Sequence, residues 1–494
     1  MRLALLPFIL LSILWNLIFC RICYAQEIGH IEWISCPSPD CPGIHDSDRI
    51  QFGKLTVPEN YAHLENGRTL AISFAVIKAR KQASKPDPVL VFAGGWGSPI
   101  LQHIDYFSEY FLGEDRDIIL YDYRGLGYSE PIICPDIGEI VYAQLVSSMT
   151  YQEFKSLQIQ LFANCLDSLE YKNIDWNQYG TDQRSKDANL LLEQLAYPSY
   201  NLLGTSGGTR TIQSFIRNAT VDIRSAIMDS SVPIGYPIIF DGIANYRTSL
   251  NRILRACVED PRCNNAYPNL GPRFFAFLAE LDKKPLNIKL RAGPKATLNR
   301  QEVNALVYNH LHDKNNFETL PFFLETLLKR KKFILRRMLN AHQIEGLIRE
   351  SINGPGFLNY MNDYKVFQSA YKPSSPQDSL TYESLDSYFS YFPLDSLFEI
   401  SDLEKVPIQT DVPTLFLVGM YDPTTPPKYT QFMEPNFSHS ITLKFPKAGH
   451  GLFNDECAQE SILRFIEHPD KRPVLPCLES YDNWEMYFFI RGKK

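Results

Sequence analysis

Short apolar runs predict β-strands in two separate parts of the chain. In the first part they lie at residues 70–77, 88–93, 117–122, 200–204 and 225–229, and in the second at residues 413–418 and 440–445. Before the fourth run, residues 183–195 carry apolar positions at helical spacing and predict a crossover helix. Strands that alternate with helices in this way are typical of an α/β fold with a mostly parallel sheet.

The pattern changes between residues 236 and 405. Strand alternation stops and helical periodicity dominates, for example at residues 274–281, 301–312, 317–328 and 333–347. Residues 371–391 are rich in Pro, Ser and Tyr, which indicates an irregular lid or linker. Because 494 residues are too many for one compact core, the chain should form either two domains or one core with a large insertion. The change of pattern favours the insertion, and we expect a core formed by residues 26–235 and 406–494. A helical cap at residues 236–405 would be inserted between its two halves.

Residues 1–25 have the pattern of a signal peptide. Arg2 precedes an apolar stretch over residues 3–19, and the segment ends on the small residue Ala25. We expect cleavage before Gln26 and a secreted or periplasmic protein. An uncleaved leader or a lipid attached to Cys20 would instead hold the protein at a membrane.

Cysteine usage supports export. Eight cysteines follow the leader: Cys36, Cys41, Cys134, Cys165, Cys257, Cys263, Cys457 and Cys477. An even number behind an export signal favours disulfides, and short loop closure favours pairing of sequence neighbours. We therefore predict the bonds 36–41, 134–165, 257–263 and 457–477. Zinc is the competing interpretation, but no CxxC pair or zinc-finger spacing occurs, so we expect no metal.

The charge balance disfavours a nucleic-acid partner. The formal net charge is −7 and becomes −9 when the leader, with its two arginines and no acid, is removed. Phosphate binding requires clustered positive charge. The basic residues at 329–332 with Arg336 and Arg337 are interpreted as a solvated helix face.

The strongest chemical motif is GTSGG at residues 204–208, a GxSxG sequence. It follows an apolar run and precedes a helix-compatible segment at residues 209–218. A serine on a sharp strand-to-helix turn has a strained backbone, and side chains at the flanking positions would collide. Ser206 is therefore the predicted nucleophile; a plain turn between strand and helix is the alternative.

A second glycine cluster, GGWG at residues 94–97, follows the strand predicted at 88–93. Acyl transfer needs two backbone N–H donors directed at the developing oxyanion. Gly207, the residue after the serine, would supply one donor. Gly95 or Trp96 would supply the other, although such a cluster can also be a flexible turn.

The acid and base of a catalytic triad should follow the serine in that order. Asp422 lies just after the strand predicted at 413–418, where a side chain can reach the C-terminal edge of the sheet. Asp411 precedes that strand and lies at its wrong end. Among ten histidines, His450 alone lies on a glycine-flanked loop directly after a late strand. The predicted triad is Ser206, Asp422 and His450.

These motifs resemble those of the α/β-hydrolases that include proline iminopeptidases and secreted tripeptidyl aminopeptidases. The sequence DYRGLGYS at residues 122–129 is similar to the DxRGxGxS run of that family, and the spacing of Cys257 and Cys263 and the late pair Cys457 and Cys477 are similar too. The resemblance extends over nearly the whole mature chain. It implies an α/β-hydrolase fold and supports the cysteine pairs.

The chain departs from the family pattern at two positions. The family's glycine loop usually reads GGPG, and here Trp96 occupies the proline position. Because proline has no N–H, the family's donor cannot lie there, which favours Gly95 over Trp96 as the second oxyanion donor. Many relatives have Tyr or a larger residue where this chain has Gly207, so the substrate pocket should differ in shape.

The resemblance implies a secreted exopeptidase that releases residues or short peptides from peptide N-termini and needs no cofactor. Such an enzyme needs an acid to pair with the substrate's α-ammonium group. Asp363 lies where relatives often carry a cap acid, and Trp96 is the other candidate substrate-binding residue. An esterase that acts on small acyl esters, or an inactive binding protein on the same fold, are the alternatives, because a fold does not determine a substrate.

Overall fold

The computed structural model describes residues 27–37, 47–81, 85–95, 98–132, 151–236, 238–281, 283–289, 295–338, 405–446, 448–481 and 486–491. The predicted leader at residues 1–25 and the predicted lid at 371–391 lie outside the described residues. The candidate residues Trp96 and Asp363 also lie outside them.

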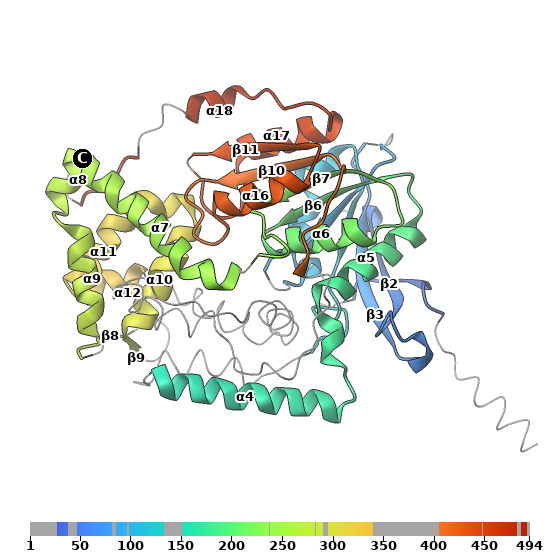
Figure 1. The fold of residues 1–494 in the computed structure, drawn as a ribbon, viewed down its shortest axis with the longest axis horizontal. Helices are drawn as coiled ribbons and strands as arrows, with labels where there is room; N and C mark the ends of the chain where they lie inside the picture. Colours follow the sequence, from blue (N-terminus) through green and yellow to red (C-terminus); the bar gives the residue numbers. More distant parts are fainter. Residues whose placement is uncertain are drawn as a thin grey trace, which may run out of the picture.

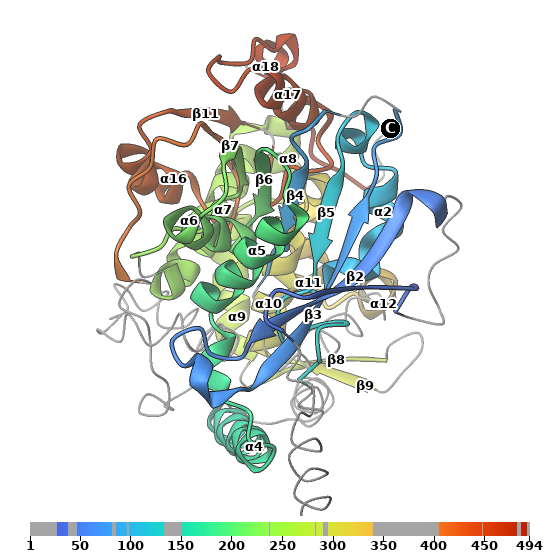
Figure 2. The same cartoon turned by 90° about the vertical axis from the view of Figure 1, so that its right-hand side faces the viewer.

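A nine-stranded sheet forms the centre of the described structure, in the order β1-β2-β3-β5-β4-β6-β7-β10-β11 (Figure 2). Its strands are β1 (Ile31–Ile34), β2 (Ile50–Pro58), β3 (Thr69–Ile77), β4 (Val89–Phe92), β5 (Ile118–Tyr121), β6 (Tyr200–Thr205), β7 (Ile223–Asp229), β10 (Thr414–Gly419) and β11 (Ser440–Phe445). All pairs from β5 to β11 are parallel, whereas β1, β2 and β3 extend the β5 edge with antiparallel pairs. The mostly parallel sheet is therefore confirmed.

All seven predicted strands are present with small shifts of their ends. The sequence analysis missed β1 and β2, which form the antiparallel edge. β1 is short and exposes Trp33, while Gly53 and Lys54 interrupt the apolar run of β2. Gly53 is required there, because a Cβ atom would lie 2.4 Å from the Phe74 ring on β3.

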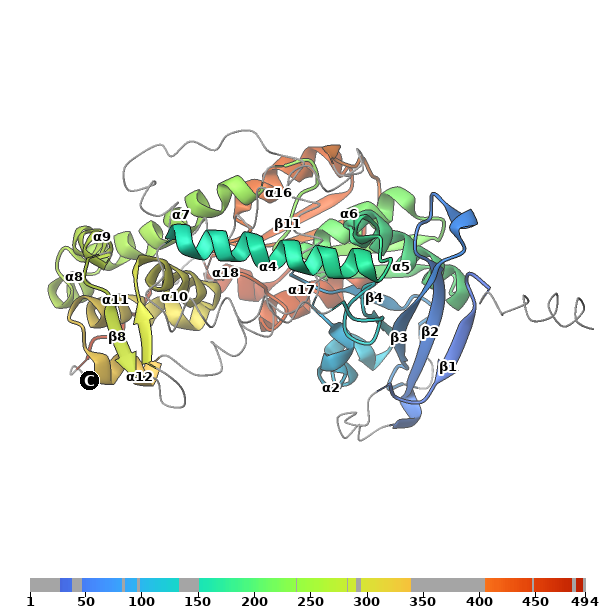
Figure 3. The same ribbon diagram turned by 90° about the horizontal axis from the view of Figure 1, so that it is seen from below.

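Helices cover the central strands, and their packing explains why β4 and β5 consist entirely of buried apolar residues. The crossover helix α5 (Thr181–Leu195) and the helix after the serine, α6 (Gly207–Asn218), pack side by side in front of the sheet in Figure 2. The long helix α4 (Tyr151–Tyr171) extends from this region towards the cap (Figure 3). The predicted helices at 183–195 and 209–218 correspond to α5 and α6.

A second unit follows β7 and gathers at one end of the molecule (Figure 1). Its elements are α7 (Ile238–Glu259), α8 (Pro261–Ala266), α9 (Leu270–Leu281), β8 (Leu286–Lys289), β9 (Lys295–Leu298), α10 (Arg300–His312), η6 (Lys314–Thr319), α11 (Leu320–Leu328) and α12 (Lys332–Met338). It has a hydrophobic cluster separate from that of the sheet. The described part of this unit, up to residue 338, is mainly helical, but the β8–β9 hairpin is a strand pair that the helical interpretation missed.

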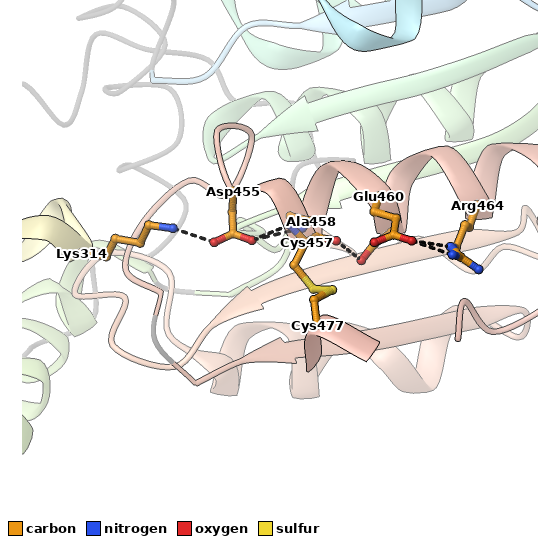
Figure 4. Close-up of a disulfide and its surroundings, with 8 residues drawn as sticks. Lys314, Asp455, Cys457, Ala458, Glu460, Arg464 and Cys477 are labelled. Atoms are coloured by element: carbon orange, nitrogen blue, oxygen red, sulfur yellow. Dashed lines mark hydrogen bonds and ion pairs between the residues drawn. A yellow bond between two sulfur atoms is a disulfide. The ribbon is translucent and has the colours of Figure 1, made fainter. Parts of the chain in front are cut away.

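Two of the predicted disulfides lie within the described residues. Cys257 bonds to Cys263 and joins α7 to α8, and Cys457 bonds to Cys477 and joins α17 (Glu456–Glu467) to α18 (Pro476–Tyr481) (Figure 4). Cys36 and Cys165 are also disulfide-bonded. Their predicted partners, Cys41 and Cys134, lie outside the described residues.

Candidate active site

Ser206 lies on a sharp turn between β6 and α6. Its backbone angles are φ 54° and ψ −125°, a strained combination for a residue with a side chain. The turn is held from both sides: the Ser206 N–H donates to the Asp229 carbonyl at 2.9 Å, and the Ser206 carbonyl accepts from the Thr209 N–H at 2.9 Å. The strained serine is therefore fixed by backbone hydrogen bonds to the next strand and to its own helix.

The glycines around Ser206 are required by close backbone approaches. A Cβ atom on Gly208 would lie 2.3 Å from the Phe92 carbonyl at the end of β4. A Cβ atom on Gly207 would lie 2.0 Å from the Gly95 carbonyl. The glycine loop after β4 thus closes directly onto the serine turn, and this contact explains why a larger residue cannot replace Gly207 here.

Gly95 itself has a positive φ of 66° and lies next to this contact. The two predicted oxyanion donors, Gly95 and Gly207, therefore come from two segments that meet at the serine. The segment that follows the glycine loop is held by Asp122. The Asp122 carboxylate accepts hydrogen bonds from the Leu101 N–H at 3.0 Å and from the Tyr128 N–H at 2.9 Å. Burial raises the pKa of Asp122 to about 6, against the effect of these bonds.

Asp422 and His450 form a direct pair, and Asp229 links the loop of His450 to the residue before Ser206. The His450 Nδ1 atom lies 2.8 Å from the Asp422 Oδ2 atom. Asp422 is fully buried, and its loop after β10 surrounds the carboxylate with donors: the Thr424 and Thr425 N–H groups at 2.7 and 2.8 Å, and the Thr425 hydroxyl at 2.6 Å. Burial opposes the negative charge, but the His450 ring and these donors outweigh it and lower the pKa of Asp422 to about 2.

The pairing with Asp422 also shifts the pKa of His450. Burial disfavours its protonated form, but the Asp422 carboxylate and, more weakly, Asp229 outweigh this effect and raise the pKa of the ring above 6.5. Because Nδ1 faces Asp422, the Nε2 atom is left for proton transfer.

The loop that carries His450 is anchored at three successive backbone N–H groups. The His450 N–H donates to the His312 carbonyl at 3.3 Å, and the Gly451 N–H donates to the Ser230 hydroxyl at 2.9 Å. The Leu452 N–H donates to the Asp229 carboxylate at 2.7 Å. Sheet and cap therefore both hold the histidine loop.

Asp229 is a residue that the sequence analysis missed. It ends β7, is fully buried, and accepts a hydrogen bond from Thr205, the neighbour of Ser206, as well as from Leu452. Burial raises its pKa to about 6. An acid at the C-terminal end of a strand next to the serine strand was the available signal. Asp229 connects the serine turn to the histidine loop.

The DYRGLGYS motif is structural in its central part. Arg124 is buried and donates to both carboxylate oxygens of Asp187 at 2.6 and 2.7 Å, and also to the carbonyls of Pro58, Glu59 and Gln178. The motif therefore ties β5 to β2 and α5 and, through Asp122, supports the glycine loop.

The described residues contain neither a helix long and apolar enough to cross a membrane nor a group of three His, Cys, Asp or Glu side chains that could hold a metal ion. The candidate residues Ser206, Asp422, His450, Gly95 and Gly207 all follow the C-terminal ends of parallel strands.

A serine turn after one parallel strand, with an Asp–His pair on loops after two later strands, is the site arrangement of an α/β hydrolase. Residues 87–456 match the family defined by the alpha/beta hydrolase fold, and the chain belongs to that family. None of the curated proteins matches it.

Three solved structures are similar to this chain at low sequence identity. A proline iminopeptidase from Mycobacterium smegmatis is 13% identical, with 84% of this chain and 98% of that chain covered and a TM-score of 0.40. An esterase from Exiguobacterium antarcticum is 15% identical, with 81% and 96% covered and a TM-score of 0.33. MGS-M2, an alpha/beta hydrolase enzyme from a Medee basin deep-sea metagenome library, is 14% identical, with 81% and 95% covered and a TM-score of 0.38.

Proposed function

We propose that this α/β hydrolase is a serine hydrolase in which Ser206, Asp422 and His450 form the catalytic triad. The observation that carries the proposal is the 2.8 Å contact between His450 Nδ1 and the buried Asp422 carboxylate, at the same edge of the sheet as a serine with φ 54°. The strained turn presents the serine hydroxyl, and the paired carboxylate orients the imidazole.

The proposed reaction uses these groups in the following order. His450 Nε2 accepts the proton of the Ser206 hydroxyl, and the serine oxygen attacks the substrate carbonyl. The Gly207 N–H, at the positive N-terminus of α6, and the Gly95 N–H stabilise the oxyanion. Protonated His450 then gives its proton to the leaving group. In the second half of the reaction His450 accepts a proton from water, the water oxygen attacks the acyl-enzyme, and His450 returns the proton to Ser206 as the acid product leaves.

We propose an exopeptidase that acts at peptide N-termini as the finer function. The resemblance of the DYRGLGYS run and of the cysteine pairs 257–263 and 457–477 to those of the secreted aminopeptidases supports it. The predicted signal peptide and the two disulfides within the described residues support an exported protein.

A serine-directed fluorophosphonate probe tests the class of enzyme. The wild-type protein should be labelled at Ser206, and Ser206→Ala should lose labelling and lower turnover by about 10⁶-fold. Turnover that is unchanged in Ser206→Ala would refute the assignment.

Peptide digestion tests the finer function. A library of peptides with free N-termini, read by mass spectrometry, should show release from that end, and N-acetylated copies should resist. Cleavage of short-chain esters without cleavage of either peptide set would identify an esterase.

A further inference from the structure

One face of cap helix α10 contacts the loop that carries the proposed catalytic acid. Tyr308 and His312 are four residues apart and therefore lie on the same side of the helix. The Tyr308 hydroxyl lies 2.7 Å from the Thr424 hydroxyl, and the His312 Nε2 atom lies 3.0 Å from the same oxygen. Two cap side chains thus hold one hydroxyl of the core.

Thr424 is also a direct partner of the acid. Its backbone N–H donates to the Asp422 Oδ1 atom at 2.7 Å. A movement of Thr424 would therefore remove one of the donors that orient the carboxylate. Helix α7 adds a second contact from the cap, because the Ser249 hydroxyl donates to the Asp422 backbone carbonyl at 3.2 Å.

His312 contacts the proposed base as well. Its carbonyl accepts the His450 N–H at 3.3 Å, and the two rings lie 5.4 Å apart between centroids. A Cβ atom on Gly449 would lie 2.8 Å from the same carbonyl, so a glycine is needed before His450 for α10 to approach. The end of α10 therefore touches both the acid loop and the histidine loop.

His312 is suited to this position because it stays neutral. Burial and the neighbouring His450 lower its pKa to about 4. A charged ring here would compete with His450 for Asp422, whereas the neutral ring can hydrogen-bond Thr424 without opposing protonation of His450 during the reaction.

We propose that Tyr308 and His312 of the cap are positioning residues that fix the Asp422–His450 pair through the hydroxyl of Thr424. The proposal rests on the proposed serine-hydrolase function. It makes the cap a structural part of the catalytic site, in addition to any role in selecting substrate.

The test uses the full-length protein and the second-order rate of fluorophosphonate labelling as a function of pH. This readout needs no knowledge of the substrate. Thr424→Val, which keeps the shape but removes the hydroxyl, and His312→Leu should each reduce the rate by up to about 10²-fold, the scale of a small misplacement of catalytic groups. Thr424→Ser, which keeps the hydroxyl, should restore most of the rate.

The pH profile separates positioning from a general loss of stability. The groups facing His450 among the described residues are Asp422 on the acid loop, Asp229 on β7, and His312 on α10, with Tyr308 close to Asp422. A looser Asp422 raises the pKa of His450 less. The acid limb of labelling should therefore move to lower pH in Thr424→Val and His312→Leu.

His310→Leu is the matched control. His310 is also a partly buried histidine of α10, and desolvation lowers its pKa to about 4. Its Nε2 atom, however, lies 3.0 Å from the Thr319 hydroxyl, and its ring stacks on Phe323 within the cap. It should lower the melting temperature about as much as His312→Leu does, and keep the wild-type labelling rate and acid limb.

The outcomes are distinguishable. If the wild-type protein is not labelled, the serine-hydrolase function itself fails. If the wild-type protein is labelled, but Thr424→Val and His312→Leu match it in rate and acid limb, the positioning role fails. If His312→Leu does not fold, two other variants test the positioning role: Thr424→Val, and Tyr308→Phe, which removes only a hydroxyl.

Discussion

Two buried carboxylates lie near His450, Asp422 on the loop after β10 and Asp229 at the end of β7, and their surroundings shift their pKa values in opposite directions. Asp422 bonds the ring directly and has a pKa lowered to about 2, whereas Asp229 bonds backbone and hydroxyl groups and has a pKa raised to about 6. A carboxyl group that stabilises the imidazolium form of the histidine must remain ionised at the working pH. These environments favour Asp422 as the triad acid and leave Asp229 as an anchor of the histidine loop.

Substitution of each acid by its amide should separate the two roles. Asp422→Asn should reduce labelling of Ser206 by about 10⁴-fold, because an amide favours the wrong tautomer of His450. Asp229→Asn should have a much smaller effect, since its amide oxygen can still accept from Leu452. Equal losses in the two variants would contradict the assignment of the acid.

The raised pKa of His450 predicts the direction of the pH dependence. Only neutral His450 can accept the proton of Ser206, so activity falls as pH decreases through the pKa of the ring. Because Asp422 raises this pKa, the midpoint of the acid limb should lie above 6.5. A labelling-rate profile across neutral pH measures it, and a midpoint below 6.5 would contradict the pairing.

At the scale of the elements, the serine turn and the glycine loop are in close backbone contact, with no space for a side chain at Gly207. Gly207→Ala would place a methyl group 2.0 Å from the Gly95 carbonyl, so both oxyanion donors must shift. We expect labelling to fall by about 10²- to 10³-fold, the cost of losing such a donor.

Gly271→Ala provides the control for this substitution. Gly271 lies in α9, and a Cβ atom there would meet only Leu254 at 3.4 Å, an ordinary contact. It should retain full labelling and melt no lower than the wild-type protein, because alanine is the better helix former. Full labelling in Gly207→Ala would show that the loop is not closed onto the turn.

The buried Arg124–Asp187 pair links β5 to α5, and each partner depends on the other. Arg124→Leu would remove the ion-pair partner of the buried Asp187 carboxylate, which would keep its hydrogen bond from Tyr61, and should cost about 3–5 kcal/mol of unfolding free energy. The exposed pair Arg464–Glu460 is the comparison, where Arg464→Ala should cost under about 0.5 kcal/mol. Urea titration measures both, and similar losses would refute the structural role of Arg124.

At the scale of the whole molecule, the chain connects core and cap more than once. Lys314 of η6 lies 2.6 Å from Asp455 at the start of α17 (Figure 4). Phe488, near the C-terminus, belongs to the hydrophobic cluster of the cap, and the Phe489 N–H donates to the Glu318 carbonyl. The last described residues thus pack on the cap, although the division of the chain at residue 406 stays a prediction.

The Cys457–Cys477 disulfide lies just before this C-terminal segment. It closes a loop over a sequence separation of 20, so its removal should cost about 3 kcal/mol through the larger entropy of the unfolded chain. The shorter Cys257–Cys263 loop should cost about 2 kcal/mol. Double Cys→Ser variants compared by urea unfolding test this order, and a larger loss for the shorter loop would contradict it.

The sequence by itself determined the elements whose signals are local. Ser206 is proposed as nucleophile because glycines flank it between a strand and a helix, and Asp422 and His450 are proposed as its partners because each follows a predicted strand. The strands β1 and β2, and the hairpin β8–β9, were missed because short or interrupted apolar runs carry little periodic signal.

Only the tertiary structure decided which groups support the proposed triad. Asp229 meets Leu452 across 223 residues, and His312 meets Thr424 across 112 residues. No local pattern marks such partners, because hydrogen bonds between distant segments depend on how sheet and cap pack together. The candidate catalytic residues can therefore be proposed from the sequence, whereas the groups that position them are determined by the fold.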